Sequence, residues 1–223
     1  MHTVFVTGGT GYMGGRLITA LVGRGHDVHA LVRRGSERKL PAADRGLTLI
    51  EGNALDASTY LSRVPRGSTF VHLVGVAHPS PAKAAQFAQI DLVGIREAVR
   101  AATTAGVGHF VYVSVAQPAP IMQAYIAVKA KGEALVHASG IPATILRPWY
   151  VLGPGHRWPY VLIPIYWILE QVPSTRESAR RLGLVTLAQM VAALVHAAEH
   201  PPAGVRIVTV SQIRGATLDS PTT

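Results

Sequence analysis

The chain contains no cysteine, which excludes disulfide bonds, thiolate nucleophiles and cysteine-ligated zinc. Aromatic residues make up only 6% and charged residues only 15% of its 223 residues, whereas 48% are hydrophobic. This composition is typical of a globular protein with a well-buried core and excludes a largely disordered chain. No apolar run reaches the roughly 20 residues that a transmembrane helix requires.

Acidic residues are few, since 12 Asp and Glu stand against 21 Lys and Arg and leave a formal net charge of +9. The basic residues are nevertheless scattered, with short clusters only at residues 33–39 and 176–181, and no nucleic-acid-binding motif is present. We therefore expect no nucleic-acid partner. The N-terminus lacks the apolar segment of a signal peptide, which together with the absence of cysteine favours a cytoplasmic location.

Apolar segments alternate with helical patterns along the chain, in the rhythm of βαβ units. After a first strand near the N-terminus, strands are expected at residues 28–32, 47–51, 69–74, 110–115, 143–147 and 205–210. Helices are expected at residues 14–24, 82–105, 125–139 and 187–199. This alternation predicts an α/β fold, a Rossmann-type doubly wound parallel sheet formed by a single domain over residues 1–223.

A glycine-rich turn follows the first strand directly and leads into the first helix, with the sequence Thr-Gly-Gly-Thr-Gly-Tyr-Met-Gly over residues 7–14. Its glycines fit both the G-x-G-x-x-G and the G-x-x-G-x-x-G spacing. Glycines let the backbone approach a pyrophosphate closely, and the amides and dipole of a helix N-terminus favour an anion. The turn predicts a dinucleotide-binding loop made of Gly8, Thr10, Gly11, Tyr12, Met13 and Gly14.

Two arginines, Arg33 and Arg34, follow the second strand. An NAD-selective site places an acidic side chain here for the ribose 2′-hydroxyl, whereas a guanidinium binds a 2′-phosphate through charge-assisted hydrogen bonds. The sequence therefore predicts NADP as the cofactor, with NAD less favoured. The alternative is that both arginines are merely solvated at the end of a strand.

A Tyr-x-x-x-Lys pair places Tyr125 and Lys129 one helical turn apart on the same face. An ammonium group beside a phenol favours the phenolate and lowers the tyrosine pKa from about 10, so that Tyr125 can exchange a proton near neutral pH. Lys129 can also hydrogen-bond the nicotinamide ribose. Ser114, at the end of the fifth strand, can polarise a substrate carbonyl. Alone, such a pair is usually an ordinary helix surface, but the glycine-rich turn and Ser114 favour a catalytic triad.

With these motifs, the chain resembles the short-chain dehydrogenase/reductase superfamily, in its extended and atypical branches, over nearly its whole length. Residues 51–56 are similar to the Gly-Asp-x-x-Asp segment near the adenine, with Asn53 in place of the usual aspartate. Residues 89–94 resemble the Asn-x-x-Gly helix, with Asp91 at the asparagine position, and residues 146–149 resemble the Arg-Pro segment that meets the nicotinamide. The subgroup of closest resemblance contains NAD(P)H-binding proteins similar to the complex I accessory NADPH-binding subunit and the NmrA-type regulators.

The resemblance implies further cofactor contacts beyond the glycine-rich turn. They are Asn53, Ala54, Leu73, Val74, Gly75, Lys129 and Pro148. It also implies that some proteins of this kind bind the nucleotide without turning it over, so that catalysis and sensing both remain open.

Residues 149–185 are expected to form a small aromatic-rich substrate lobe at the C-terminal side, because residues 149–172 are rich in Trp, Tyr, Pro and branched aliphatic side chains. These side chains can line an apolar pocket that shields the nicotinamide. A peripheral contact with an anionic membrane is the alternative. An H-x-x-E-H pattern at residues 196–200 ends at two prolines and has no third ligand, so no metal is expected, and His26 is expected at the surface.

These observations predict an NADP-dependent oxidoreductase that acts on a carbonyl or alcohol of a small apolar molecule. Epimerase or dehydratase chemistry through transient oxidation is compatible with the same residues. The alternative function is a non-catalytic NADPH-binding sensor or assembly protein. Either a monomer or a homodimer is compatible with the resemblance.

Overall fold

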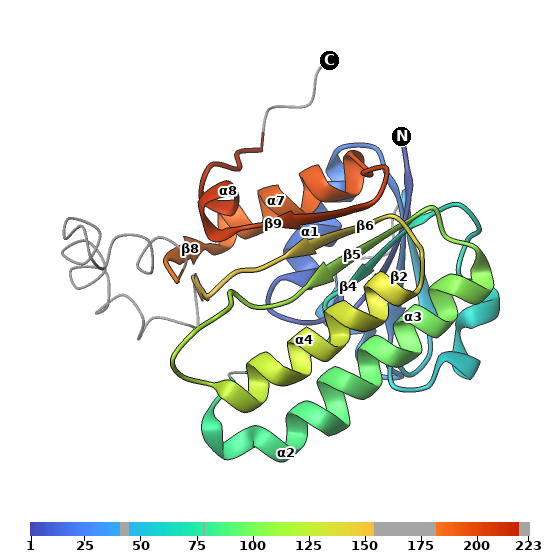
Figure 1. Cartoon of the computed structure of the whole chain (residues 1–223). Coiled ribbons are helices and arrows are strands. Elements are labelled where there is room, and N and C mark those ends of the chain that lie inside the picture. Colours follow the sequence, from blue (N-terminus) through green and yellow to red (C-terminus); the bar gives the residue numbers. More distant parts are fainter. Residues whose placement is uncertain (41–44, 78, 154–181, 219–223) are drawn as a thin grey trace.

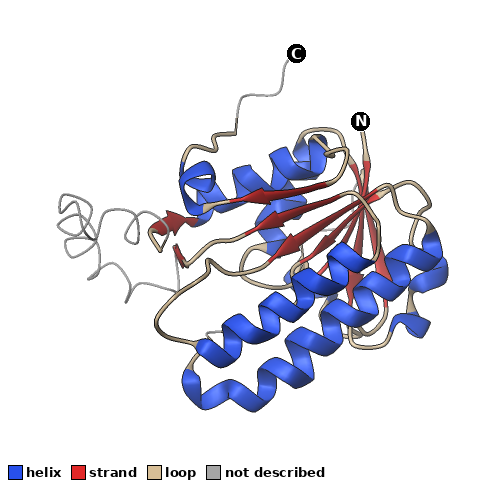
Figure 2. Cartoon of the chain, in the orientation of Figure 1, coloured by secondary structure: helices blue, strands red, loops and turns tan. Residues whose placement is uncertain are grey.

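The structure is a computed structural model that describes residues 1–40, 45–77, 79–153 and 182–218. Within these residues, seven parallel strands form one sheet in the order β3-β2-β1-β4-β5-β6-β9 (Figures 1 and 2). The strands of this sheet are β1 (Thr3–Thr7), β2 (Asp27–Val32), β3 (Leu47–Glu51), β4 (Thr69–His72), β5 (His109–Val113), β6 (Ala143–Leu146) and β9 (Val205–Val208). Two further short strands, β7 (Tyr150–Leu152) and β8 (Leu184–Thr186), pair in parallel as a separate small sheet.

Helices cover both faces of the large sheet, as a doubly wound fold requires (Figure 1). The helices α3 and α4 pack against each other on one face, and α1 and α7 pack against each other on the other. The α-helices are α1 (Gly14–Gly23), α2 (Ala84–Gln86), α3 (Val93–Ala105), α4 (Gln123–Ala138), α7 (Leu187–Glu199) and α8 (Val210–Arg214). Single turns are η1 (Glu37–Lys39), η2 (Ala57–Thr59), η3 (Leu61–Arg63) and η4 (Pro81–Lys83), and η5 (Phe87–Leu92) is π-helical. The predicted Rossmann-type fold is confirmed.

Each face of the sheet has its own hydrophobic core, because successive residues of a strand point to opposite faces. In β1, Val4 and Val6 join the core under α1 and α7, whereas Phe5 joins the core under α3. Phe5 packs against Phe70 with ring centroids 5.0 Å apart, and Phe70 stacks on Phe110 at 5.2 Å. Burial of each such side chain stabilises the fold by roughly 1.5–3 kcal/mol. The central strands are therefore packed against hydrophobic side chains on both faces of the sheet.

The strand order reverses between β1 and β4, and this switch point marks the expected ligand-binding crevice. In open α/β sheets the crevice lies at the carboxyl ends of the strands on either side of such a switch point. The carboxyl end of β1 leads into the glycine-rich turn at residues 8–14, and the carboxyl end of β4 leads into residues 73–76. The topology thus brings two of the predicted cofactor segments to one edge of the sheet.

Several boundaries differ from the sequence-based expectation, and three of these differences bear on the site or on the edge of the sheet. The single helix expected over residues 82–105 is divided by the π-helical η5. Two side chains of η5, Phe87 and Asp91, contact Tyr125 and Lys129 of α4. The strand expected over residues 69–74 ends at His72, where the chain turns into the crevice. The last strand ends at Val208, because Thr209 forms a capping box with Gln212 and begins α8.

The substrate lobe expected over residues 149–185 is described only at its two ends, since residues 154–181 lie outside the described residues. At the first end, the Trp149 and Tyr150 rings meet edge to face with centroids 5.4 Å apart. In the part of the chain that the structure describes, no helix is both long and apolar enough to cross a membrane.

Candidate active site

The glycine-rich turn has the close backbone approaches that its sequence predicts. Gly8 has a φ of 79°, and a Cβ on it would lie 2.7 Å from the carbonyl carbon of Leu73. A Cβ on Gly14 would overlap the carbonyl oxygen of Gly8 and lie 2.6 Å from the Cα of Gly9. The backbone therefore passes where side chains cannot fit, and the first turn of α1 carries no acidic side chain. Such a loop at a helix N-terminus fits a pyrophosphate group.

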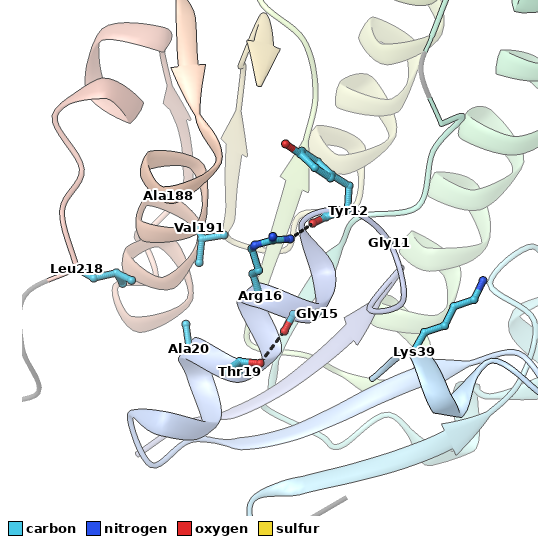
Figure 3. A pocket seen from close by; sticks show the side chains of 10 residues that line it. All are labelled: Gly11, Tyr12, Gly15, Arg16, Thr19, Ala20, Lys39, Ala188, Val191 and Leu218. Carbon is cyan, nitrogen blue, oxygen red and sulfur yellow. Dashed lines mark hydrogen bonds between the residues drawn. The ribbon is translucent and has the colours of Figure 1, made fainter. Parts of the chain in front are cut away.

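Tyr12 continues the loop at the molecular surface, with 38% of its side chain exposed. Its carbonyl oxygen accepts a hydrogen bond from Arg16 at 3.4 Å, while its ring points away from α1 (Figure 3). Beside the loop, an open pocket of about 620 Å³ lies between α1 and α7 (Figure 3). Its lining residues are Gly11, Tyr12, Gly15, Arg16, Thr19, Ala20, Lys39, Ala188, Val191 and Leu218. This pocket flanks the predicted dinucleotide loop and contains none of the predicted catalytic side chains.

The residues expected near the adenosine half lie after β2 and β3, the two strands beyond β1. Arg33 and Arg34 are both exposed immediately after Val32, the last residue of β2. Asn53 lies just beyond β3, where its side-chain oxygen accepts a hydrogen bond from the backbone N–H of Leu55 at 3.1 Å. Ala54 packs partly buried against the core under α3. The two guanidinium groups are thus accessible to a phosphate at the edge of the crevice.

Tyr125 and Lys129 lie on the first half of α4, as the Tyr-x-x-x-Lys spacing predicts. Lys129 is 4% exposed, and its Nζ lies 3.1 Å from Oδ1 of Asp91 and donates a hydrogen bond to the Val113 carbonyl oxygen at 3.2 Å. The same Nζ is 5.5 Å from the centroid of the Tyr125 ring. Tyr125 packs in turn against Phe87, with ring centroids 4.9 Å apart. The ammonium group is therefore fixed next to the phenol.

Burial raises the pKa of Tyr125 above its ordinary value, and the Lys129 ammonium lowers it by less than burial raises it. This net direction corrects the sequence-based expectation that Lys129 brings the pKa below about 10. The physical reason is that a phenolate loses part of its hydration at this partly buried position. Burial alone would also lower the pKa of Lys129, but Tyr125, Tyr112 and Asp91 raise it above its ordinary value. Lys129 therefore stays charged at neutral pH.

Residues 73–76 connect the glycine-rich turn to this pair. The Leu73 backbone lies against Gly8, and the Val76 backbone N–H donates to Oδ2 of Asp91 at 3.0 Å. A Cβ on Gly75 would lie 2.8 Å from Oδ1 of Asp91 and 3.7 Å from Nζ of Lys129. The segment at residues 73–76 therefore links the glycine-rich turn to the Tyr-Lys pair.

Ser114 is buried at the end of β5 and donates a hydrogen bond of 2.5 Å to Oε1 of Glu133. Glu133 also accepts from Arg147 through both carboxylate oxygens, at 2.9 and 2.5 Å, and from Gln117 at 3.1 Å. Pro148 follows Arg147, is buried, and accepts the N–H of Ala116 with its carbonyl oxygen at 2.8 Å. Hydrogen bonds through Glu133 and between Ala116 and Pro148 therefore connect the segments that follow β5 and β6.

Glu133 was not among the residues predicted from the sequence, although one signal pointed to it. Glu133 lies four residues after Lys129, so it shares the buried face of α4 with Tyr125 and Lys129. A carboxylate at this spacing on a buried face requires a cationic or hydrogen-bonding partner. Its partner Arg147 was expected beside the nicotinamide only because residues 146–149 resemble the Arg-Pro segment of the superfamily.

The residues of the H-x-x-E-H pattern make structural contacts. The Glu199 carboxylate accepts hydrogen bonds from Arg24 at 2.7 and 3.1 Å and lies 2.9 Å from Nε2 of His26, while the His196 and His200 rings stack at 4.1 Å. His26 is only 5% exposed, so the expectation of a surface position was wrong. Among the described residues, no group of three His, Asp or Glu side chains is arranged to hold a metal ion.

Comparisons with known proteins identify the family of this chain. The sequence profile of the family described as NAD(P)H-binding matches residues 8–160. A ceramide reductase from Caulobacter vibrioides is 31% identical over 153 residues, covering 68% of this chain and 47% of the relative. A 3-diazoavenalumate denitrifying reductase from a Streptomyces species is 33% identical over 178 residues, covering 68% of this chain and 57% of the relative. The chain thus spans about half the length of these curated relatives.

Among solved structures, the Bordetella bronchiseptica enzyme WbmH in complex with NAD+ superposes with a TM-score of 0.68. The sequences are 20% identical, and the match covers 94% of this chain and 75% of that chain. At this identity the likeness shows the shared Rossmann-type fold alone.

Proposed function

The chain belongs to the NAD(P)H-binding family, within the atypical branch of the short-chain dehydrogenase/reductase superfamily, and from this premise we propose that it is an NADP-dependent oxidoreductase. The proposed substrate is a carbonyl or alcohol carried by a small apolar molecule. One observation carries the proposal: residues 73–76 contact the glycine-rich turn at Gly8 and the Asp91–Lys129 pair. A dinucleotide held at the turn would extend along this segment toward Tyr125.

The residues of this chain fit such a cofactor at three places. The amides of the turn at residues 8–14 would hold the pyrophosphate. Arg33 and Arg34 would bind a 2′-phosphate through charge-assisted hydrogen bonds, which supports NADP over NAD. Lys129 would hydrogen-bond the ribose next to the nicotinamide. When bound, the reduced cofactor supplies the hydride for the reaction.

In the reductive direction, Tyr125 donates its phenolic proton to the substrate oxygen while the carbonyl carbon accepts a hydride. The carbonyl becomes an alcohol, and the phenolate that remains is stabilised by the Lys129 ammonium and regains a proton from solvent. Tyr125 is protonated at neutral pH, because its pKa lies above the ordinary value of 10.0. It therefore has a proton to donate to the substrate oxygen.

The apolar character of the substrate is supported by the composition of residues 149–172 and by one relative whose name identifies its substrate as ceramide. Trp149 and Tyr150, at the described end of this segment, follow directly after Pro148 at the site. Aromatic and aliphatic side chains beside the reacting carbon would bind an apolar molecule and exclude water.

The proposal is tested by measuring NADPH and NADH consumption with a panel of apolar aldehydes, ketones and quinones. Tyr125→Phe is expected to lower kcat by about 10²–10⁴-fold while the affinity for NADPH is unchanged. Tyr60→Phe is the matched control, because Tyr60 is fully buried in the core under α3 and its hydroxyl has no hydrogen-bond partner. Turnover that survives in Tyr125→Phe would contradict the assigned proton donor.

A second candidate function, a sensor or assembly protein that retains NADPH without turnover, is favoured by one observation. The Ser114 hydroxyl donates to Glu133, so it cannot donate to a substrate oxygen at the same time. Tight NADPH binding without consumption on the whole panel would support this function. Measurable consumption that depends on Tyr125 would exclude it.

A further inference from the structure

The Lys129 ammonium lies close to the rings of two tyrosines. Its Nζ atom is 5.2 Å from the centroid of the Tyr112 ring and 5.5 Å from the centroid of the Tyr125 ring. Tyr125 precedes Lys129 by one turn of α4, whereas Tyr112 comes from β5 and is 1% exposed. Lys129 therefore meets β5 twice, through the face of the Tyr112 ring and through its hydrogen bond to the Val113 carbonyl oxygen.

A glycine of α4 lets this helix approach the Tyr112 ring closely. Gly132 is buried in the interior of α4, and a Cβ on it would overlap the Tyr112 hydroxyl oxygen and lie 2.9 Å from Cζ of the same ring. Glycine in a helix interior lowers the stability of the helix relative to alanine. Its presence here is explained by the space that the Tyr112 ring occupies. The helix that carries Lys129 therefore packs directly against this ring.

The Tyr112 side chain acts through its ring and not through its hydroxyl. Among the described residues, this buried hydroxyl has no hydrogen-bond partner. Burial raises the pKa of Tyr112 to about 12, so the phenol is neutral at neutral pH and forms no ion pair with Lys129. The attraction that remains is that of the negative ring face, which binds a cation within about 6 Å of its centroid and does so more strongly away from water.

We propose that Tyr112 is a positioning residue, whose ring face holds the Lys129 ammonium by a cation–π interaction. Lys129 has three hydrogen-bond donors, and it directs two of them at Oδ1 of Asp91 and at the Val113 carbonyl oxygen. These partners fix the directions of two N–H bonds, while the ring stabilises the charge that burial has separated from water. Only the effect on coenzyme binding rests on the proposed function, in which Lys129 binds the ribose.

The test compares two rings of nearly equal shape at position 112. Tyr112→Phe keeps the negative ring face and removes an unpaired buried hydroxyl, so this variant should be at least as stable in urea as the unmodified protein. Pentafluorophenylalanine at the same position reverses the polarity of the ring face, so the ammonium is repelled. We expect the folding equilibrium constant of the fluorinated protein to be about tenfold lower than that of Tyr112→Phe.

The same comparison in a Lys129→Met background separates charge from packing. Methionine is flexible, unbranched and uncharged, so the difference between the two rings should fall below about twofold there. Phe110 is the matched control position, because it lies on the same face of β5, is 1% exposed and stacks on Phe70. Its fluorination should change stability by the same factor with and without the ammonium. Equal stability of the two Tyr112 variants, or a difference that persists without the ammonium, would overturn the proposal.

A second measurement decides the matter if Lys129→Met does not fold. The chain has four lysines, Lys39, Lys83, Lys129 and Lys131, so each ε-carbon can be followed separately by NMR relaxation in lysine-labelled protein. The ε-carbon of Lys129 should be more mobile in the fluorinated protein than in Tyr112→Phe, whereas that of the exposed Lys131 should be unchanged. Equal mobility of the Lys129 ε-carbon in the two proteins would contradict the cation–π interaction.

Coenzyme binding separates this proposal from the proposed function. The stability and relaxation measurements are made without coenzyme, so they test the contact between Tyr112 and Lys129 even if the protein binds no coenzyme. If NADPH binds, the fluorinated protein should bind it several-fold more weakly than Tyr112→Phe, because the ammonium is no longer held in place for the ribose. An unmodified protein that binds no NADPH would refute the proposed function alone.

Discussion

The hydroxyl of Ser114 donates a hydrogen bond of 2.5 Å to Oε1 of Glu133, and both side chains are buried. Because Arg147 binds the same carboxylate through two nitrogen atoms, the end of β5 is joined to α4 and to the end of β6. This linkage supports the helix face that carries Tyr125 and Lys129. It also directs the Ser114 proton to Glu133.

Ser114→Ala should therefore act mainly on stability. We expect a loss of about 1–2 kcal/mol in the free energy of unfolding, since a hydrogen bond to a charged group is removed from the interior. On a substrate from the carbonyl panel, kcat should stay within about threefold of the unmodified protein. Urea unfolding and steady-state kinetics measure the two effects. A fall in kcat of about 10²–10³-fold would instead show that Ser114 holds the substrate oxygen.

Gly14→Ala should damage both the fold and coenzyme binding. The added Cβ would overlap backbone atoms of Gly8 and Gly9, which cannot move aside as a side chain can. We expect a loss of about 2–4 kcal/mol in the free energy of unfolding and no measurable NADPH binding by calorimetry. Gly23→Ala, in the same helix, has no atom within 4 Å of its added Cβ and should be neutral or stabilising by up to about 1 kcal/mol.

Replacement of both Arg33 and Arg34 by alanine should weaken NADPH binding by about tenfold or more. The reason is the loss of charge-assisted hydrogen bonds to the 2′-phosphate, each of about 1.5–3 kcal/mol. NADH has no such phosphate, so its Kd should change by less than about twofold. Arg96→Ala, which removes an exposed cation from α3, is the control for a general charge effect. Equal weakening of both coenzymes would contradict NADP selectivity.

Glu199→Gln should lower stability in a pH-dependent way. Burial raises the pKa of Glu199, but hydrogen bonds from Arg24 and His26 and their positive charge outweigh burial and leave this pKa below its ordinary value of 4.5. A carboxylate with a lowered folded-state pKa stabilises the fold above the ordinary value, and this contribution is lost as the pH falls through the lowered value.

The free-energy difference between the unmodified protein and Glu199→Gln should thus be about 1 kcal/mol at neutral pH and shrink steadily below pH 4.5. Urea unfolding in neutral, mildly acidic and strongly acidic buffers measures it. Glu51→Gln, which removes an exposed carboxylate from the end of β3, should show no such trend. A difference that stays constant across this range would mean that the Arg24 and His26 contacts do not stabilise ionised Glu199.

Local patterns in the sequence predicted most elements of the fold. The glycine-rich turn at residues 8–14 required a strand before it and a helix after it, and β1 and α1 occupy those positions. The predicted helix over residues 187–199 and the strand over residues 47–51 match α7 and β3 in both bounds. These signals depend on periodicity and turn chemistry within a few residues, which a sequence displays directly.

Such local patterns do not predict contacts between residues that lie far apart in the sequence. His26 was expected at the surface because it flanks the second strand, but its Nε2 atom lies 2.9 Å from the carboxylate of Glu199, 173 residues away, and the side chain is buried. The division of the expected helix by η5 likewise follows from packing against α4, because Phe87 and Asp91 there face Tyr125 and Lys129.

The sequence by itself determined the Rossmann-type fold, the glycine-rich turn and the positions of Tyr125 and Lys129, because each is encoded in spacings of a few residues. Only the tertiary structure determined the pKa shifts and the contacts of these side chains. It placed Asp91 against Lys129, Glu133 against Ser114, and Tyr125 in surroundings that raise its pKa. The physical reason is that ion pairing and desolvation depend on distances across the folded core, which the order of residues along the chain does not specify.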